Sequence, residues 1–342
     1  MRPTADALFC LGLYPAAEVG ADLQIDGAVD ARLLSNTGPI TRLFKDWWPS
    51  CRMIGVTCDG EKAAPAEPAS GRGTALFFSG GVDSSYSLVS STPRLGALIT
   101  VLGVDAPLAD TEASARLEAL CRDTAAAKGL VPIVIETNVK EVFHPYAGWI
   151  EHHGSVLAAI GHMLSGDLER VLIASSGNEL TWHAPWGSHP ALDPLFSSAA
   201  VEIEHHGLVS RFDKIAAVAK DERLIGTLRV CNRARHNCGV CDKCTFAMRC
   251  LDILGETERA TSFPPFTPRR GHLKIVDDAF RSELERMLEA ALEAGRTDLV
   301  DEIRKTLATY RRQRFFKRAG IQPWRSWSRV MRHRTRWNKA AR

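Results

Sequence analysis

A glycine-containing segment that joins an apolar strand to a helix is the strongest constraint on how this chain folds. The apolar run Thr74–Phe78 leads into Ser79-Gly80-Gly81-Val82-Asp83-Ser84-Ser85, and Ser84–Ser91 then has a helical pattern. Glycine reaches backbone conformations with positive φ, so successive amides can face one concavity that suits an anion. The helix N-terminus adds unpaired N–H groups and the positive end of its dipole.

This loop is therefore predicted to hold phosphate groups. Gly80 and Gly81 allow the tight turn, while Ser79, Ser84 and Ser85 supply hydroxyl donors. The carboxylate of Asp83 suits Mg²⁺ on the phosphates. The loop is neither a Walker A loop nor a dinucleotide fingerprint, because Gly-Lys-Ser/Thr and Gly-x-Gly-x-x-Gly are both absent. A Ser/Gly turn that only caps a helix is the alternative.

Apolar strands alternate with helical stretches through the middle of the chain. The expected strands after Thr74–Phe78 are Leu95–Val104, Val131–Glu136 and Arg170–Ala174, and the helices are Ser84–Ser91, Glu112–Lys128, Ser155–Leu164 and Ser210–Lys220. Such strands, buried on both faces, predict an α/β fold with a doubly wound parallel sheet. Ligands bind at the carboxyl ends of the strands in these folds, which places Leu102–Asp105 beside the ligand.

Four regions are expected along the chain. Residues 1–65 form a small N-terminal lobe, 74–255 the nucleotide-binding domain, 272–310 a helical hairpin and 311–342 a basic tail. The first boundary is Glu61–Gly73, a linker rich in Ala, Pro, Gly and charge. Thr227–Val230 is predicted as a short strand that leads to Cys231. His152 and His153 are expected just before the helix that starts at Ser155.

Four of the nine cysteines crowd into fourteen positions, as Cys231-x6-Cys238-Gly-Val-Cys241-Asp-Lys-Cys244. Four thiolates at this spacing can close a tetrahedral Zn²⁺ site, and Gly239 permits a tight knuckle. An iron–sulfur cluster is the rival, since Cys-x2-Cys-x2-Cys also suits that ligation. The basic residues Arg233, Arg235, Lys243 and Arg249 would offset the thiolate charge. Clustered cysteines indicate a metal site in a reducing cytoplasm more than a disulfide framework.

Together, the loop and the cysteines resemble the ATP pyrophosphatases of the PP-loop superfamily. The Ser-Gly-Gly-x-Asp-Ser loop is similar to the superfamily's, and the cysteine pattern about 150 residues later resembles the 7-cyano-7-deazaguanine synthase branch. The resemblance covers roughly Thr74 to Gly255 and implies an adenine nucleotide alpha hydrolase-like fold. It also implies ATP cleavage between the α- and β-phosphates, an adenylated carboxylate, and transfer to ammonia.

The resemblance assigns roles to residues of this chain. Ser79, Gly80, Gly81, Asp83 and Ser84 would hold pyrophosphate and Mg²⁺, and Cys231, Cys238, Cys241 and Cys244 would hold Zn²⁺. Gly177 and Asn178, in Ser175-Ser176-Gly177-Asn178-Glu179, would contact phosphate or ribose, with Glu179 near a metal; a plain strand-to-helix turn is the alternative. Lys214 would neutralise phosphate, although a solvated helix lysine is the rival interpretation.

Substrate identity does not transfer with the resemblance. Some 70 residues precede the loop, and the first cysteine spacing is shorter than in the branch. The segment Trp182–Asp193 does not match the expected deazaguanine pocket. Its Trp182, His183, Trp186, Ser188, His189 and Asp193 are the candidate contacts for a small carboxylate substrate. A surface loop with its own aromatic cluster is the alternative.

Charge is divided unevenly along the chain. The total is +3, but residues from Arg304 onward hold 14 basic and no acidic side chains, which leaves residues 1–303 at −11. Arginines interleaved with Trp324, Trp327 and Trp337 suit nucleic acid or an anionic membrane surface. Unstructured charge, or docking on the acidic body, are the alternatives. Nucleic-acid binding predicts retention on heparin or tRNA that disappears when residues 311–342 are deleted; unchanged retention contradicts it.

Three functions follow from these patterns. The first is an ATP-dependent ligase that adenylates a carboxylate and transfers it to ammonia or an amine. The second is a tRNA-modifying enzyme that adenylates a base for thiolation or amidation, and the third is a non-catalytic nucleotide-binding scaffold. Ordinary composition argues against a collagen, a coiled-coil rod or a disordered chain. The chain has no stretch of 18 apolar residues, so no transmembrane helix is expected. A cleaved signal peptide is not expected either.

Overall fold

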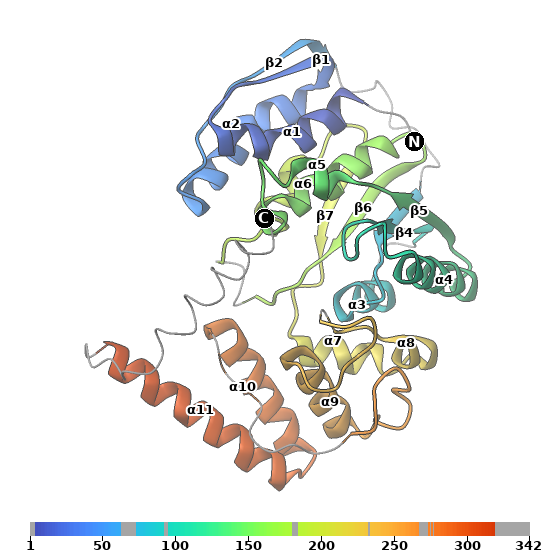
Figure 1. Ribbon diagram of the computed structural model, residues 1–342, viewed down its shortest axis with the longest axis vertical. Coiled ribbons are helices and arrows are strands. Elements are labelled where there is room, and N and C mark those ends of the chain that lie inside the picture. The colour runs from blue at the N-terminus through green and yellow to red at the C-terminus, as the bar shows by residue number, and fades with distance from the viewer. Residues whose placement is uncertain are drawn as a thin grey trace. The chain divides into compact units, whose positions relative to one another are not determined.

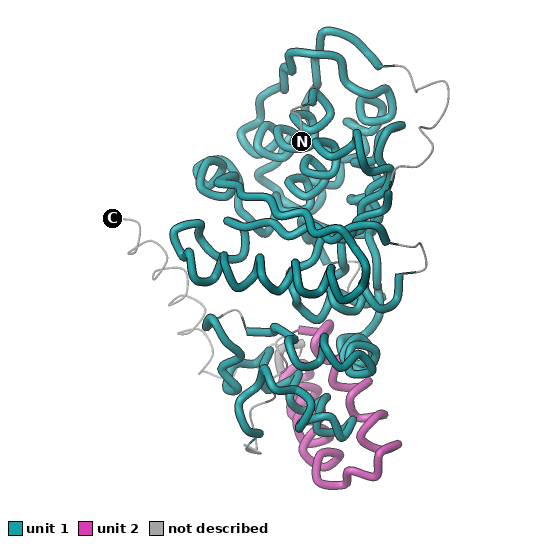
Figure 2. Tube along the Cα trace, turned by 90° about the vertical axis from the view of Figure 1, so that its right-hand side faces the viewer, with its two compact units in different colours: residues 1–267 teal, residues 268–342 magenta. Residues whose placement is uncertain are grey.

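Two units make up the chain, Met1–Thr267 and Pro268–Arg342 (Figure 2). The structure is a computed structural model that describes residues 4–62, 73–91, 95–179, 184–231, 233–266, 273, 275 and 277–318. Trp182 and His183 lie outside the described residues, as do positions 319–342, with Trp324, Trp327 and Trp337. None of the described helices is both long and apolar enough to cross a membrane.

A five-stranded parallel sheet lies at the centre of the first unit (Figure 1). Its strands are β3 (Gly73–Phe77), β4 (Ala97–Leu102), β5 (Val131–Glu136), β6 (Leu168–Ala174) and β7 (Glu202–His206). Their order across the sheet is β5-β4-β3-β6-β7. The chain therefore starts in the middle, moves outward to β5 and returns to the other side of β3. The prediction of an α/β fold with a parallel sheet is confirmed.

The central strands are buried on both faces of the sheet. Phe77 of β3 and Ile99 of β4 belong to a core that includes residues of helices α6 (Trp149–Met163) and α1 (Ala5–Val19). Their neighbours Leu76 and Leu98 are fully buried too. Helix α4 (Thr111–Lys128) packs on β4 and β5. Burial on two sides is why these strands are continuous apolar runs in the sequence.

The remaining helices of the first unit's sheet region are mostly short. They are α3 (Val82–Ser90), α5 (Val139–Phe143), the 3-10 helix η1 (Asp193–Phe196), α7 (Arg211–Val218), α8 (Glu222–Thr227) and α9 (Asp242–Leu254).

Two local predictions are wrong. Helix α6 begins at Trp149, so His152 and His153 lie inside it and not before it. Its Gly154 interrupts the apolar pattern because a Cβ there would lie 2.0 Å from the backbone oxygen of Gly187. The predicted strand Thr227–Val230 consists of the end of α8 followed by a single bridge between Gly81 and Arg229.

The first sixty residues fold as an α/β element. Strands β1 (Leu23–Asp30) and β2 (Val56–Lys62) form a two-stranded parallel sheet, joined by α2 (Ala31–Trp47). Helix α1 packs against α6. Hydrogen bonds extend this contact, because the Asp30 carboxylate accepts from the Ala199 amide at 3.1 Å and the Asn36 side chain donates to the Leu195 carbonyl at 2.8 Å. The lobe therefore folds against the sheet region within one unit.

The second unit contains a helical hairpin, as the periodicity predicts. Helices α10 (Asp278–Glu293) and α11 (Thr297–Arg318) are joined at Gly295, whose φ is +67°. The hairpin pairs part of the basic run internally, since Arg314 contacts Asp278 and Arg311 lies 3.6 Å from Glu285. The charges of Arg311 and Arg314 are thus partly neutralised by α10.

Candidate functional site

The glycine loop connects the C-terminal end of β3 to the N-terminus of α3. Gly80 has φ +69°, and a Cβ at this position would lie 2.3 Å from Cδ2 of Leu120. Gly81 is the N-cap of α3 with φ −77°, so the expectation of positive φ at both glycines holds only for Gly80. A side chain at Gly80 is excluded by strain and by space, whereas Gly81 has an ordinary backbone conformation.

Hydroxyl groups converge inside this loop. The Oγ atoms of Ser79 and Ser84 lie 3.4 Å apart, and Ser84 Oγ accepts from the Ser79 amide at 3.3 Å. Ser85 is only 1% exposed, and its amide donates to the Gly81 carbonyl in the first turn of α3. Ser79 and Ser84 are therefore better placed than Ser85 to meet a ligand.

Lys214 joins this loop to the one that follows β6. Its side chain is buried in α7, and its Nζ donates to Asp83 Oδ1 at 2.9 Å, to the Ser175 carbonyl at 2.6 Å and to the Gly177 carbonyl at 3.3 Å. An ammonium group has three donors, and these contacts match that number. The alternative of a solvated helix lysine is therefore wrong.

Asp83 is held as a carboxylate by two cations. Besides Lys214, Nη2 of Arg211 lies 3.4 Å from Asp83 Oδ2. Burial alone would raise the pKa of Asp83, but Arg211 and Lys214 outweigh it and hold the pKa below its ordinary value. The side chain keeps 24% of its surface exposed, so the carboxylate is charged and still accessible.

The loop after β6 stands beside the glycine loop because β6 is the neighbour of β3. Ser175 donates its amide to the His206 carbonyl at 2.7 Å, and its Oγ accepts from the Gly177 amide at 3.2 Å. Asn178 is 6% exposed. Lys214 therefore connects the Gly177 carbonyl of this loop to Asp83 of the glycine loop.

A cavity of about 230 Å³ lies at the carboxyl ends of β3, β4 and β6. Besides apolar residues and two phenylalanines, its wall contains Ser79, Asp83, Ser84, Asp105, Trp149 and His153. The first three are residues expected from the loop, and Asp105 was expected at the end of the second strand. Trp149 and His153 come from α6, and sequence reasoning gave neither this role.

His153 is presented to the cavity as a neutral ring. Its Nδ1 lies 3.0 Å from the Ile150 carbonyl and 3.2 Å from the Trp149 carbonyl, so Nδ1 carries the proton and Nε2 is the acceptor. Burial lowers the pKa of His153, partly opposed by the charge of Asp193. The only sequence signal is the His152-His153 pair, and its helical setting requires the true start of α6.

The described part of the candidate substrate segment is mostly internal. Ser188 donates from Oγ to Asp193 Oδ2 at 2.7 Å, and Asp193 Oδ2 also lies 2.7 Å from His205 Nδ1. The amide of His189 donates to Asp193 Oδ1 at 3.1 Å. All of these side chains are almost fully buried, whereas Trp186 is 40% exposed. The network fixes the loop, and Trp186 remains as the side chain open to a ligand.

The four clustered cysteines meet in space. Their Sγ atoms all lie within 4.8 Å of one another, and the Cys231–Cys241 and Cys238–Cys244 pairs are each 3.9 Å apart. Zn–S bonds of about 2.3 Å place the sulfurs of a tetrahedral site about 3.8 Å apart. The cluster is therefore compatible with zinc binding.

Backbone donors and a glycine prepare the cluster. The Arg233 amide donates to Cys231 Sγ and the Cys244 amide to Cys241 Sγ, both at 3.4 Å. Burial raises the pKa of Cys231, but backbone N–H groups outweigh burial and lower it to about 6. Gly239 has φ +69°, and a Cβ there would lie 2.6 Å from Cγ of Pro264. These features favour a thiolate at Cys231 in a fixed knuckle, whereas burial raises the pKa of Cys241 and of Cys244.

The basic residues near the cluster have different roles from those expected. The Arg235 side chain pairs with Asp110 and Glu112 of the α4 N-terminus, and Arg249 is buried, with its guanidinium 5.5 Å from the ring centre of Phe266. Of the four expected to offset thiolate charge, Arg233 is the one that donates to a sulfur, through its backbone amide and not its side chain.

Arg229 ties the cysteine cluster to the glycine loop. Its Nη1 donates to the Ser79 carbonyl at 3.0 Å and its amide to the Gly80 carbonyl at 2.9 Å. Cys231 follows two residues later, and its amide donates to Asn237 Oδ1 at 3.2 Å. The sequence marks Arg229 only by its place before the first clustered cysteine. The loop and the cluster are thus structurally connected through one short segment.

Comparisons of the chain with protein-family models, with curated proteins and with solved structures find no match. The first unit nonetheless brings together a glycine loop, a buried lysine and a cavity at the same end of the sheet. A four-cysteine cluster lies one short segment away. This set of residues is the basis of the function given below.

Proposed function

We propose that the chain is an ATP-dependent ligase that adenylates a carboxylate and passes the acyl group to ammonia or an amine. The carrying observation is the Lys214–Asp83 pair, which fixes the glycine loop against the loop after β6 beside a cavity. The strand order β5-β4-β3-β6-β7 supports a doubly wound sheet, in which ligands lie where the strand order reverses. The PP-loop resemblance supplies the reaction class.

In this proposal the substrate carboxylate attacks the α-phosphorus of ATP, and the bond to the β-phosphate oxygen breaks. The loop amides, with Ser79 and Ser84, bind the departing pyrophosphate, while the α3 N-terminus stabilises its charge. A nitrogen nucleophile then attacks the acyl carbon, loses a proton and releases AMP. These residues act by positioning and by charge stabilisation.

Two metal ions have candidate ligands in the chain. Asp83 Oδ2 has only the longer contact, 3.4 Å to Arg211, and we assign this oxygen to Mg²⁺ on the phosphates. The four cysteines would hold a structural Zn²⁺, which leaves them no role as persulfide carriers. This arrangement disfavours thiolation, the reaction of the tRNA-modifying alternative.

ATP–pyrophosphate exchange, screened across carboxylic acids with Mg²⁺, tests the proposal. We expect exchange with at least one acid and its loss in Asp83→Asn. Asp123→Asn is the matched control, because Asp123 is an exposed aspartate of α4 outside the cavity. Binding of α,β-methylene-ATP by calorimetry gives a second readout. If the chain neither binds this analogue nor cleaves ATP with any acid, the proposal fails.

A further inference from the structure

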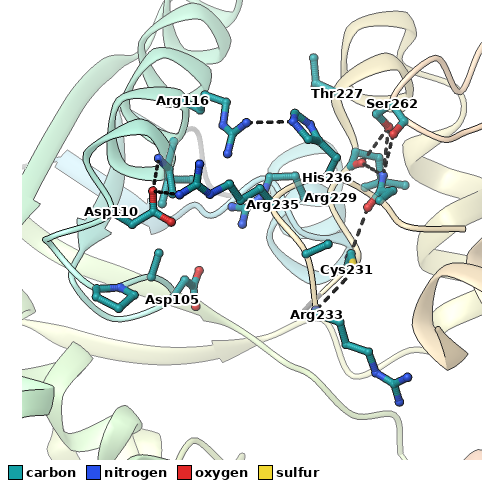
Figure 3. A pocket seen from close by; sticks show the side chains of 17 residues that line it. Asp105, Asp110, Arg116, Thr227, Arg229, Cys231, Arg233, Arg235, His236 and Ser262 are labelled. Atoms are coloured by element: carbon teal, nitrogen blue, oxygen red, sulfur yellow. Dashed lines mark hydrogen bonds and ion pairs between the residues drawn. The ribbon is translucent and has the colours of Figure 1, made fainter. Parts of the chain in front are cut away.

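A second, larger cavity adjoins the first and has no part in the proposed reaction. Its volume is about 490 Å³, and it shares Asp105 and Leu117 with the cavity beside the glycine loop. Its wall comes from three stretches of the first unit and from Ser262 (Figure 3). The stretches are the residues from Asp105 into α4, the residues 227–231, and the segment between Cys231 and Cys238.

Positive charge dominates this wall. Four arginines line it, together with His236, against two aspartates, Asp105 and Asp110. The arginines are Arg116, Arg229, Arg233 and Arg235. The first unit lies within the acidic part of the chain, so this concentration of arginine runs against the surrounding charge. A guanidinium fork matches phosphate oxygens in two-point hydrogen bonds.

Neighbouring carboxylates hold two of the arginines in place. Arg235 contacts Asp110 at 3.1 Å and also pairs with Glu112 (Figure 3 shows the Asp110 contact). Arg116 contacts Glu112 at 3.3 Å and His236 Nε2 at 3.0 Å, both through Nη1. A guanidinium has five N–H donors. Among the described residues, the partners of Arg116 contact only its Nη1, so Nε and Nη2 remain to bind a ligand. These contacts restrict the conformations of the Arg116 and Arg235 side chains and still leave N–H donors to bind a ligand.

The other two arginines differ in exposure. Arg233 has a side chain that is 68% exposed, 3.9 Å from Asp242. Arg229 is half-buried and contacts the glycine loop at the carbonyls of Ser79 and Gly80.

We propose that this cavity is a second anion site, which takes a small ligand bearing a phosphate group. Four arginines face two aspartates in the wall, and the further carboxylates of Glu112 and Asp242 pair with three of these arginines. A guanidinium has five N–H donors, so the arginines can still donate to the several oxygen acceptors of a phosphate group. The volume of about 490 Å³ lies in the range of small-molecule sites, roughly 300–1,000 Å³. Because the cavity shares Asp105 and Leu117 with the first one, such a ligand is positioned to act as an effector of the neighbouring site.

Titration calorimetry of the full-length chain with inorganic phosphate tests this site. Arg116→Gln and Arg233→Gln are each expected to raise the Kd about tenfold, since a charged hydrogen-bonding partner is lost. Arg122→Gln is the matched control, because Arg122 lies on the same helix and pairs with Glu118 as Arg116 pairs with Glu112, yet is not in the cavity wall. Its Kd should equal that of the unchanged chain.

Several outcomes would overturn the site. These are no phosphate binding by the unchanged chain, equal weakening by Arg122→Gln, or a Kd that neither Arg116→Gln nor Arg233→Gln alters; the last result would place the phosphate in the glycine loop. Binding of citrate as tight as that of phosphate also contradicts the proposal. So does binding of a short RNA by a chain that does not bind phosphate. Arg233→Gln, on an exposed side chain, guards against a folding artefact. The variant Asp83→Asn distinguishes this site from the proposed ATP site. If it loses α,β-methylene-ATP binding but still binds phosphate, the second anion site is supported.

Discussion

At the scale of single residues, Lys214 has the largest structural consequence in the candidate site. It connects Asp83, which lies 131 positions earlier, to the carbonyls of Ser175 and Gly177. The residues around it in sequence are those of an ordinary amphipathic helix, so its burial cannot be read locally. Only the resemblance pointed to Lys214, and its partners come from the fold.

Replacing Lys214 with methionine should lower the free energy of unfolding by about 3 kcal/mol, because it removes the buried cation that donates to the Asp83 carboxylate and to the Ser175 carbonyl. Urea denaturation followed by circular dichroism measures this change. Lys220→Met, at an exposed lysine just after α7, is the control and should change the midpoint little. Equal midpoints for Lys214→Met and the unchanged chain would show that the buried pair contributes nothing to stability.

At the scale of elements, α6 serves two parts of the first unit with adjacent residues. His152 is 2% exposed and lies with Nε2 2.8 Å from the Leu11 carbonyl of α1, whereas His153 lines the cavity. The predicted start of the helix is six residues too late because Gly154 breaks its pattern. A glycine needed for close approach to Gly187 looks, in the sequence, like a helix boundary.

His152 should make stability depend on pH. Burial lowers its pKa to about 4, against about 6.5 in the unfolded chain. A group with a depressed folded pKa contributes stability above its unfolded pKa and loses it as the pH falls through the folded value. We therefore expect the free energy of unfolding to decline from about pH 6.5 to about pH 4, by at most about 3 kcal/mol from this residue.

Denaturation midpoints of His152→Gln at several pH values check this expectation. Glutamine can still donate to the Leu11 carbonyl but does not titrate, so the decline should be shallower than in the unchanged chain. His144→Gln is the control, because His144 is exposed and should leave the slope as it is. An identical slope in His152→Gln would contradict the prediction. His153, His162 and His206, whose pKa values are also lowered, account for the slope that remains.

At the scale of the whole molecule, features that depend on residues close together in the sequence could be predicted, and contacts between residues far apart in the sequence could not. Strands, helices and the cysteine spacing are local patterns, and four of the five parallel strands, β3 to β6, agree with the predicted ranges. The contacts that make the site, Arg229 to Ser79 and Lys214 to Asp83, span more than a hundred positions. Local periodicity contains no information about such pairs, and Trp149 and Arg229 were missed for this reason.

Arg229 connects the cysteine cluster to the glycine loop, so a substitution in the cluster should also affect ligand binding at the loop. Cys241→Ser should remove a thiolate and abolish binding of one Zn²⁺ per chain, measured by plasma mass spectrometry. We also expect weaker α,β-methylene-ATP binding, because the segment that positions Arg229 is released. Cys58→Ser, in β2, is the control and should keep the metal. Full metal content in Cys241→Ser, or iron in place of zinc, would contradict the assignment.

The separation of the site's parts along the chain has a consequence during synthesis. The glycine loop leaves the ribosome long before its supports, since Lys214 follows Asp83 by 131 positions and Arg229 follows Ser79 by 150. At about 5–20 residues per second, this delay is roughly 8–30 s. A nascent chain therefore exposes a glycine loop without these supports for that interval, and the candidate site can be completed only when translation has passed Arg229.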